Sequence, residues 1–253
     1  MAWKLDEIMV YVASKTIKDH DVVLVGTGLP LVTSYYAQRT HAPNLTMVFE
    51  SGAVSPVPKD LAVGPGDFPL QKTAIMQSSL FDALSYAQRG IIDVGFLGGA
   101  EIDEYGNINT TVIGSYNKPD VRLPGSGGAN DIASCAKKTI IIAKHKLRTF
   151  PKKLCYITTP GYLSGVKDRK DHGLRGEGPA CLVTDFGLFV YDEKTRRTRI
   201  KSIHPGVTKQ QIIENTGFEI LGIEEDVPET QIGGQKELDI IRSIDPTNMY
   251  LGK

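Results

Sequence analysis

Hydrophobic and polar positions follow two different periods along this 253-residue chain. Between residues 5 and 18, apolar side chains recur with the period of a helix, which predicts an amphipathic helix. Short, mostly apolar runs follow at 22–25 and 45–49, each closed by a glycine-containing turn, as is typical of buried strands. A helical stretch at 31–39 separates the two runs, so the order strand, helix, strand predicts a parallel α/β sheet.

The rest of the chain continues this alternation. The segment 53–70 is rich in Pro and Gly and predicts a long loop. Strands are expected at 91–97, 139–143 and 154–158, a late β-hairpin region at 181–203, and helices at 78–89, 207–215 and 235–243. We find no internal repeat, so we predict one α/β domain over residues 1–253. Its core is an open, mostly parallel sheet flanked by helices, with the late hairpin packed on it.

Charge and composition exclude several classes of protein. Lys plus Arg and Asp plus Glu number 29 each, so nothing predicts the basic face of a nucleic-acid-binding protein. No apolar run is long enough to span a membrane, and MAWKLDE at the start carries charge where a signal peptide needs an apolar core. We therefore expect a cytoplasmic protein whose partners are small molecules or other protein chains.

The three cysteines are Cys135, Cys155 and Cys181, and no C-x-x-C pair occurs. An odd number at wide spacing predicts reduced thiols rather than disulfides or a zinc site. Because Cys155 and Cys181 lie within apolar runs, we expect buried rather than reactive side chains there.

Four turns contain the candidate chemistry. Gly26 and Gly28 lie between a strand and a helix, where backbone N–H groups can approach an anion. A dinucleotide fingerprint would need a third glycine, so the residues alone favour a tight βα turn over a ligand loop. Glu50 follows the second strand, at the end where α/β sheets bind ligands, and the alternative is a solvated glutamate.

The other two turns lie further along the chain. Gly98 and Gly99 end a strand and can expose amides to a developing oxyanion, or they form a plain turn. The glycine-rich stretch 125–130 predicts a loop that something passes over closely, and the alternative is a surface linker. Asp103 and Asn107 are expected to hold the intervening turn by hydrogen bonds to the backbone.

Familiar catalytic signatures are missing. The sequence has no Walker loop, no H-E-x-x-H and no locally supported Ser/His/Asp order, and His204 before Pro-Gly predicts a structural turn residue. A carboxylate and backbone amides are the chemistry that remains.

Taken in order, these turns resemble the β subunit of family I CoA-transferases, most of all the glutaconate CoA-transferases. The resemblance covers nearly the whole chain outside 53–90. It rests on VGTGLPL at 25–31, APN at 42–44, FESG at 49–52, FLGGAEIDEYGNINTT at 96–111, RLPGSGGANDIA at 122–133, TPGY at 159–162, VTDFGLFVYDEKTRR at 183–197 and ENTGFE at 214–219.

The resemblance assigns roles to particular residues. Glu50 takes the place of the nucleophile that forms a covalent glutamyl-CoA thioester, and the amides of the Gly98-Gly99-Ala100 turn contact the oxyanion. Residues expected to border the acyl or CoA site are Gly26, Gly28, Ser51, Gly52, Ser126, Gly127, Gly128, Ala129 and Asn130.

The resemblance also implies a reaction and a partner. The family moves CoA between carboxylic acids as α/β hetero-oligomers, so we expect an α subunit, acyl-CoA and acids as partners. Coenzyme A is then a substrate, and no cofactor or metal is needed. A dicarboxylate such as glutaconate is suggested, with Lys118 and Arg122 as alternatives between a partner for its distal carboxylate and solvated surface residues.

Two other functions stay open at this point. Some relatives are CoA-thioester hydrolases or C–C lyases, including decarboxylases, and characteristically lack the E-S-G glutamate; its presence here favours transfer. A non-catalytic structural subunit is the third interpretation, and it predicts that Glu50 is dispensable.

Overall fold

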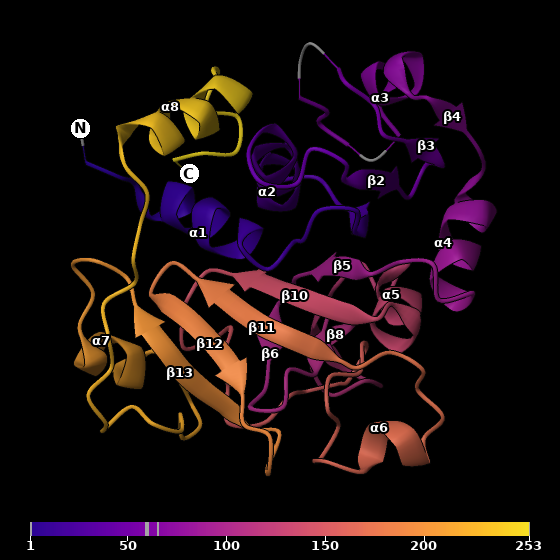
Figure 1. Ribbon diagram of the computed structural model, residues 1–253. Coiled ribbons are helices and arrows are strands. Elements are labelled where there is room, and N and C mark those ends of the chain that lie inside the picture. Colours follow the sequence, from indigo (N-terminus) through magenta and orange to yellow (C-terminus); the bar gives the residue numbers. More distant parts are fainter. Residues whose placement is uncertain (1, 59–60, 65, 253) are drawn as a thin grey trace. The chain divides into compact units, whose positions relative to one another are not determined.

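The computed structural model describes residues 2–58, 61–64 and 66–252, which form two compact units (Figure 1). The first unit comprises Met1–Phe96 and Gln231–Lys253, and the second comprises Leu97–Thr230. The chain therefore leaves the first unit within one strand and returns to it for its last residues. This division into two units does not test whether the chain is one domain, so the single domain expected from the sequence stays a prediction.

The first unit alternates helices and strands, as its hydrophobic periods predict. Its elements are α1 (Leu5–Ser14), β1 (Val22–Val25), α2 (Leu29–Arg39), β2 (Thr46–Phe49), β3 (Ala53–Val54), α3 (Phe68–Thr73), β4 (Met76–Gln77), α4 (Leu80–Gln88), β5 (Val94–Leu97) and α8 (Gln235–Ile244).

The strands of the first unit follow the order β5-β1-β2-β3-β4. β1 is parallel to both β5 and β2, while β3 and β4 add antiparallel pairs at the edge. Val25 is the register partner of Phe49, so β1 and β2 end at the same level. Their next residues, Gly26 and Glu50, therefore begin neighbouring loops at the carboxyl edge of the sheet.

Helices α1, α2 and α8 give the first unit its apolar cover. Ile8, Met9 and Val12 on α1 are buried, and each such side chain contributes about 1.5–3 kcal/mol relative to full exposure. Buried Glu7 on the same helix accepts a hydrogen bond of 2.7 Å from Nε of Arg242 on α8. This ion pair fixes the C-terminal segment to the N-terminal helix.

The second unit is built from a sheet and short peripheral elements. Its helices and strands are β6 (Glu101–Ile102), β7 (Ile108–Asn109), β8 (Val112–Gly114), β9 (Pro119–Arg122), α5 (Ala129–Cys135), β10 (Lys138–Ala143), α6 (Asp168–Asp171), β11 (Pro179–Thr184), β12 (Gly187–Tyr191), β13 (Thr198–Ile203) and α7 (Lys209–Glu214).

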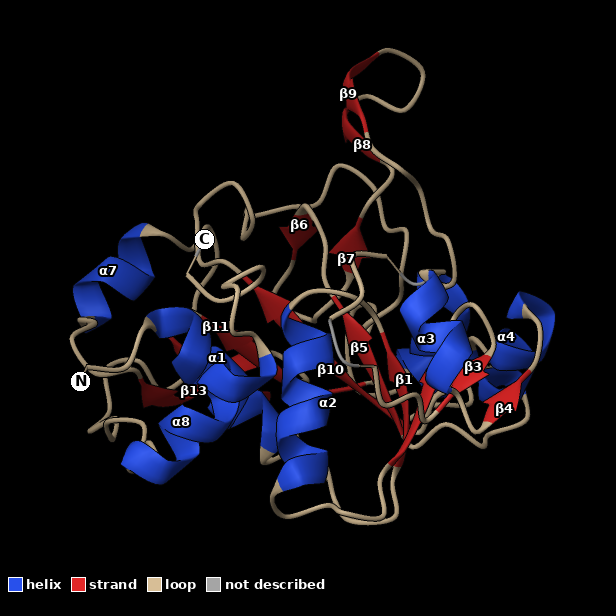
Figure 2. Cartoon of the chain, turned by 90° about the horizontal axis from the view of Figure 1, so that it is seen from above, coloured by secondary structure: helices blue, strands red, loops and turns tan. Residues whose placement is uncertain are grey.

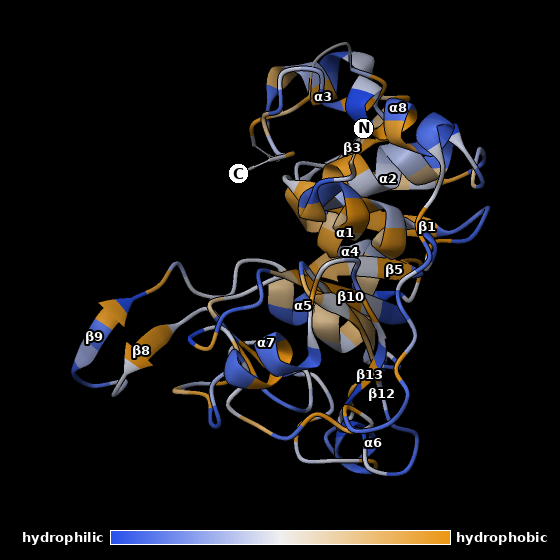
Figure 3. Ribbon diagram, turned by 90° about the vertical axis from the view of Figure 1, so that its left-hand side faces the viewer, coloured by the Kyte–Doolittle hydropathy of each residue, from blue (hydrophilic) through white to orange (hydrophobic). Residues whose placement is uncertain are grey.

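The sheet of the second unit runs β10-β11-β12-β13, with β10 parallel to β11 and the later pairs antiparallel. The predicted late hairpin thus extends the parallel pair instead of packing on it. The hairpin β8–β9 projects from the unit as an arm, which Figures 2 and 3 both show. Together the two units confirm the predicted α/β class.

No helix within the described residues is long and apolar enough to cross a membrane.

Several local expectations were wrong. Residues 154–158 form no strand, and Cys155 is exposed, whereas Cys181 is buried in β11 as expected. The apolar residues at 154–158 do not form a strand, because the described backbone there has no neighbouring strand to pair with. The nearest pairing is one isolated bridge at the adjoining Thr159. The first helix ends at Ser14, short of residue 18. The expected loop 53–70 contains β3 and the start of α3, and its residues 59, 60 and 65 lie outside the described part.

Candidate active site

Glu50 lies in a three-residue hairpin loop between β2 and β3. The loop is closed by a hydrogen bond of 2.9 Å from the N–H of Gly52 to the carbonyl of Phe49. Gly52 has φ of +91°, the left-handed conformation that glycine typically supplies at the end of such loops. The motif Glu-Ser-Gly therefore forms a tight turn, in which the glycine allows the backbone to close and the other two residues carry the side chains.

The turn is also fixed to the segment that precedes α4. The backbone N–H and the hydroxyl of Ser78 each donate to the carbonyl of Gly52 at 3.0 Å. A Cβ at position 52 would lie only 2.2 Å from the Ser78 carbonyl oxygen, so no larger residue fits without a backbone shift. The position of Glu50 is thus set by packing on both sides of the loop.

The Glu50 carboxylate is half-buried and makes no hydrogen bond or ion pair with any other described residue. Carboxylates that serve structure are normally paired with donors when they leave water. A carboxylate without partners in a rigid turn has both oxygens available to a ligand.

Ser51, the next residue, has a buried hydroxyl oxygen with no hydrogen-bond partner in the described part of the chain. A buried hydroxyl without a partner costs about 1–3 kcal/mol, so this group favours binding of something that can hydrogen-bond to it.

The glycine loop 26–28 lies beside the Glu50 turn, because Val25 and Phe49 are register partners on parallel strands. Gly28 has φ of +89° and caps the start of α2, where its carbonyl accepts from the N–H of Leu31 at 3.1 Å. Gly26 has open space around it, so its backbone can be approached closely. In the first unit the structure therefore groups Gly26, Gly28, Glu50, Ser51 and Gly52 at one sheet edge.

One group beside the glycine loop was missed in the sequence. The hydroxyl of Tyr250 donates to the carbonyl of Ala62 at 2.5 Å, and Gly28 gives it a backbone hydrogen bond. No local pattern could have found the hydrogen bond from Tyr250 to Ala62, because the two residues lie 188 positions apart in the sequence.

The Gly98-Gly99-Ala100 turn lies in the second unit. A Cβ on Gly99 would meet the side chain of Ile108 at 2.1 Å, and one on Gly98 would meet the carbonyl of Ile142 at 3.1 Å. Close packing is therefore one reason why positions 98 and 99 are occupied by glycine. Ala100 donates its N–H to the carbonyl of Asn109 at 3.0 Å, which leaves Gly98 and Gly99 as the candidate oxyanion donors of this turn.

The loop 125–130 is attached to the same region through Thr110. The N–H of Gly125 donates to the Thr110 carbonyl at 2.8 Å, and the Thr110 hydroxyl donates to the Gly125 carbonyl at 2.8 Å. Gly127 has φ of +50°, and Asn130 donates from Nδ2 to the carbonyl of Thr158 at 3.1 Å. The second unit thus contains the remaining predicted residues: Gly98, Gly99, Ala100, Ser126, Gly127, Gly128, Ala129 and Asn130.

Two other carboxylates follow closely on the Gly98-Gly99 turn, and both are saturated with hydrogen bonds. Buried Glu101 accepts from Nδ2 of Asn109 at 2.6 Å and from the N–H of Cys155 at 3.0 Å. Asp103 accepts at 2.9 Å from the N–H of Asn107 and at 2.8 Å from its Nδ2, which confirms the predicted turn. Burial nevertheless raises the pKa of Asp103 to about 6.

Two buried histidines also serve structure. Burial lowers the pKa of His145 to about 3 and that of His204 to about 4. His145 stacks on Phe186 at 4.9 Å between ring centroids. Nδ1 of His204 lies 2.9 Å from the hydroxyl of Thr230, in agreement with the structural role expected for it.

The two cations with alternative roles, as partners of a substrate carboxylate or as solvated surface residues, lie on the projecting arm. Lys118 and Arg122 are both exposed, and the Arg122 guanidinium lies 5.2 Å from the centre of the Tyr116 ring. Arg122 thus has an intramolecular contact on the arm.

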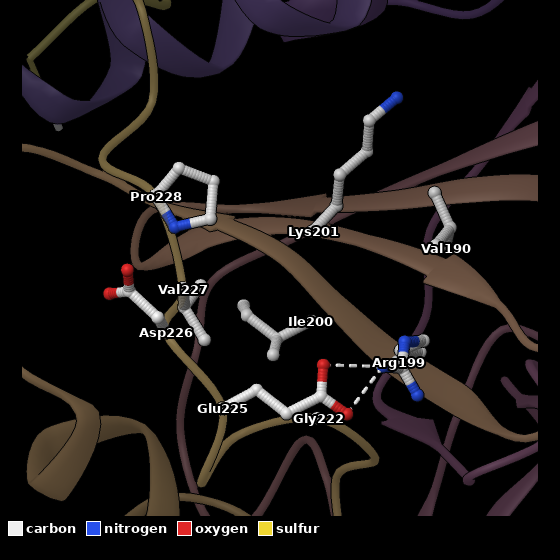
Figure 4. Close-up of a pocket in the computed structure, with 9 residues that line it drawn as sticks. All are labelled: Val190, Arg199, Ile200, Lys201, Gly222, Glu225, Asp226, Val227 and Pro228. Carbon is white, nitrogen blue, oxygen red and sulfur yellow. Dashed lines mark hydrogen bonds and ion pairs between the residues drawn. The ribbon is translucent and has the colours of Figure 1, made fainter.

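A cavity of about 380 Å³ opens elsewhere in the second unit (Figure 4). Arg199 and Glu225, which line it, form an ion pair of 2.6 Å, and Val190, Val227 and Pro228 line its apolar part. None of the predicted site residues lines this cavity. We therefore do not assign the reaction to it.

Comparison with known proteins agrees with the fold. The family description Coenzyme A transferase matches residues 7–215. The chain is 42% identical to the B subunit of 3-oxoadipate CoA-transferase of Pseudomonas knackmussii over 245 residues, covering 96% of this chain and 94% of that protein. It is 39% identical to the B subunit of glutaconate CoA-transferase of Acidaminococcus fermentans over 220 residues, covering 85% and 82%.

The crystal structure of glutaconate coenzyme A-transferase from Acidaminococcus fermentans superposes with a TM-score of 0.92 at 33% identity, covering 99% of this chain and 98% of that one. A family match over most of the chain, two similar subunits and a shared fold give one conclusion: this chain is a member of the coenzyme A transferase family.

Proposed function

We propose that the chain is the catalytic β subunit of a CoA-transferase and that Glu50 carries CoA between two carboxylic acids. The observation that carries this proposal is the partner-free, half-buried carboxylate of Glu50 in a turn fixed by Gly52. A nucleophilic carboxylate must be held in place while its oxygens stay available, and this loop meets both needs.

The proposed reaction proceeds through two acyl intermediates. A Glu50 oxygen attacks the thioester carbonyl of the donor, the C–S bond breaks, and CoA thiolate leaves behind a mixed anhydride. The thiolate then attacks the glutamyl carbonyl, which forms the Glu50–CoA thioester and releases the donor acid as its carboxylate. The acceptor carboxylate passes through the same steps in reverse. A carboxylate suits this task because its anhydride keeps the acyl group activated.

Each attack develops negative charge on a carbonyl oxygen. One preorganised N–H donor at such an oxyanion is worth about 3 kcal/mol. The family resemblance assigns this role to the turn at 98–100, and the hydrogen bond from Ala100 to Asn109 narrows the candidates to Gly98 and Gly99. Exclusion of water is a second requirement, because water would hydrolyse the anhydride.

The partner and the acids follow from the relatives. Both similar proteins are named as B subunits, and we infer that this chain works with an α subunit. Their names contain 3-oxoadipate and glutaconate, which are both dicarboxylates, so we propose that one of the exchanged acids carries a second carboxylate. The cytoplasmic location stays a prediction.

The test uses this chain co-purified with the α subunit, which we expect to be encoded beside it. Acetyl-CoA is offered with a panel of mono- and dicarboxylic acids, and both new acyl-CoA and free CoA thiol are measured. The proposal predicts new acyl-CoA with at least one dicarboxylate and little free thiol. Net loss of thioester that does not depend on an acceptor would instead establish the hydrolase or lyase alternative.

A further inference from the structure

Another cavity in the second unit, with a volume of about 280 Å³, is lined by residues of the 103–107 turn, the 152–157 segment and Leu163. Its apolar lining consists of Tyr105, Leu154, Ile157 and Leu163. The side chain of Ile157 is 48% exposed, so it is accessible to a ligand in the cavity. Two apolar residues of the segment that forms no strand at 154–158 therefore provide one wall of this cavity.

The wall at Leu163 is held in an unfavourable backbone conformation. Leu163 has φ of +55°, which a residue other than glycine adopts only at an energetic cost. The side chain of Asn107 maintains it, because Nδ2 donates to the Leu163 carbonyl at 2.7 Å and Oδ1 accepts from the Leu163 N–H at 3.0 Å. Strain that the surrounding structure maintains is typical of ligand-binding sites. The shape of the cavity is therefore fixed before a ligand binds.

The two carboxylates that line the cavity are already satisfied within the chain. Glu104 forms an ion pair with Arg197. Asp103 accepts from the N–H of Asn107 at 2.9 Å and from its Nδ2 at 2.8 Å. Neither carboxylate is thus available to bind a cation, so the charge offered to a ligand comes from the lysines of the cavity.

These lysines are Lys152 and Lys153, which are both exposed and both line the cavity. Neither ammonium group makes a hydrogen bond or ion pair with another described residue. The backbone of Lys152 is closely packed, because a Cβ on Gly217 would lie only 2.5 Å from its nitrogen. Two ammonium groups without partners on a packed segment favour an anionic ligand, and phosphate is a typical anion for lysine.

A ligand that fits this cavity needs an apolar face and an anionic group. The nucleotide end of coenzyme A has both, because its purine ring can stack on an aromatic side chain and its phosphates can bind lysine. Small-molecule pockets begin at about 300 Å³, so a cavity of this volume suits one end of coenzyme A rather than the whole molecule.

We propose that this cavity binds the 3′-phosphoadenosine end of acyl-CoA. The purine packs against Tyr105 and Ile157, and the phosphates pair with the two lysines. This inference rests on the proposed function and deepens it, because it assigns a binding site to the part of CoA that does not react. Contacts to that part are equally strong in the ground state and the transition state, so they lower KM and leave kcat unchanged.

The experiment uses adenosine 3′,5′-bisphosphate, which carries the purine and the 3′-phosphate of CoA but no thiol. Calorimetric titration should show that it binds the two-subunit enzyme, and it should compete with acetyl-CoA in the exchange assay. In the double variant Lys152→Gln, Lys153→Gln, the Kd of this nucleotide and the KM for acetyl-CoA should both rise about tenfold, with kcat within about twofold.

The control is the double variant Lys201→Gln, Lys236→Gln, which loses the same charge at two exposed positions outside this cavity. It should leave all three constants unchanged. Equal constants in the two double variants would overturn the inference, and so would a nucleotide that does not bind the wild-type enzyme or binds without competing with acetyl-CoA. Failure of the proposed function is separate, because the titration requires no transfer: the nucleotide would then still bind to an enzyme that exchanges no CoA.

Discussion

Carboxylates close to strand ends serve opposite purposes in the two units. In the first unit, Glu50 follows β2, is half-buried, and its carboxylate makes no hydrogen bond to any other described residue. In the second unit, Glu101 and Asp103 come soon after β5 and are both surrounded by donors. The difference separates a group that is available to a substrate from groups that hold the fold.

The same contrast extends to the neighbouring residues. Around Glu50, Ser51 has a buried hydroxyl without a described partner. Around Asp103, the side chain of Asn107 is fully buried and makes four hydrogen bonds, to Asp103, Gly161 and twice to Leu163. Unmet hydrogen-bonding capacity, more than burial, marks the candidate site.

The largest expected effect concerns Glu50 itself. Glu50→Gln keeps the shape of the side chain but removes the nucleophile, so acyl exchange should fall by at least about 10³-fold. Because Glu50 has no structural partner, the thermal midpoint should stay within about 2 °C. Exchange assays and calorimetry on the two-subunit enzyme measure both quantities. Exchange at the wild-type rate would remove the distinction between the two kinds of carboxylate.

Asn107→Ala tests the structural side of the comparison. Loss of four buried hydrogen bonds should lower the free energy of unfolding by about 3–4 kcal/mol, which is a fall of about 6–16 °C in thermal midpoint. Thermal unfolding of the variant and of Asn117→Ala, an exposed residue of the arm, provides the measurement and its control. A midpoint equal to that of the control would contradict the structural role.

Gly52→Ala tests how firmly the Glu50 turn is held. The added Cβ meets the Ser78 carbonyl, so we expect a loss of about 2–3 kcal/mol in stability and a loss of exchange activity. Gly90 has φ of +74° with no atom near its Cβ position, and Gly90→Ala should cost only about 1 kcal/mol. Denaturant titrations of the pair separate the clash from the backbone strain. Equal losses would show that Ser78 does not constrain the turn.

Acid should weaken the second unit through its histidines. Their pKa values in the folded state, about 3 for His145 and about 4 for His204, lie below the unfolded value, so the unfolded state binds more protons as pH falls. Each histidine then lowers stability by about 1.4 kcal/mol per pH unit from pH 6.5 downward. Asp103, with its pKa raised to about 6, acts in the opposite sense between about pH 6 and 4.

His145→Gln isolates one of these contributions. The slope of unfolding free energy against pH, measured by urea titration between pH 6 and 4.5, should decrease by about 1.4 kcal/mol per unit. The same change at exposed His20 should leave the slope as it is. An unchanged slope in His145→Gln would mean that the imidazole is protonated in the folded protein.

The smallest effect is expected at Ser51. Ser51→Ala removes a buried hydroxyl without a described partner, so the isolated chain should be as stable as wild type or more stable by up to about 1 kcal/mol. Urea unfolding gives the value. A clear loss of stability would show that the hydroxyl already has a hydrogen bond in the free protein.

The sequence predicted the parts of the fold that depend on local periodicity. Strands at Val22–Val25 and Gly187–Tyr191 and the turn at Glu50 were all predictable, because apolar runs and glycine report nearby geometry. The false strand at 154–158 shows the limit, since an apolar run forms a strand only if a neighbouring strand is there to pair with it.

The candidate site was predictable in its residue types but not in its connections. Strand-end position and family resemblance both indicated Glu50. The hydrogen bond from Tyr250 to Ala62 and the occupied N–H of Ala100 depend on tertiary packing, which no local pattern encodes. Long-range hydrogen bonds of this kind can be identified only from the three-dimensional structure.

Mass spectrometry of the enzyme with acyl-CoA tests the central claim most directly. Without an acceptor acid, the two-subunit enzyme should gain the mass of CoA, and digestion should place that mass on the peptide that contains Glu50. Covalent CoA on a different residue, or steady exchange without any adduct on this peptide, would contradict the account.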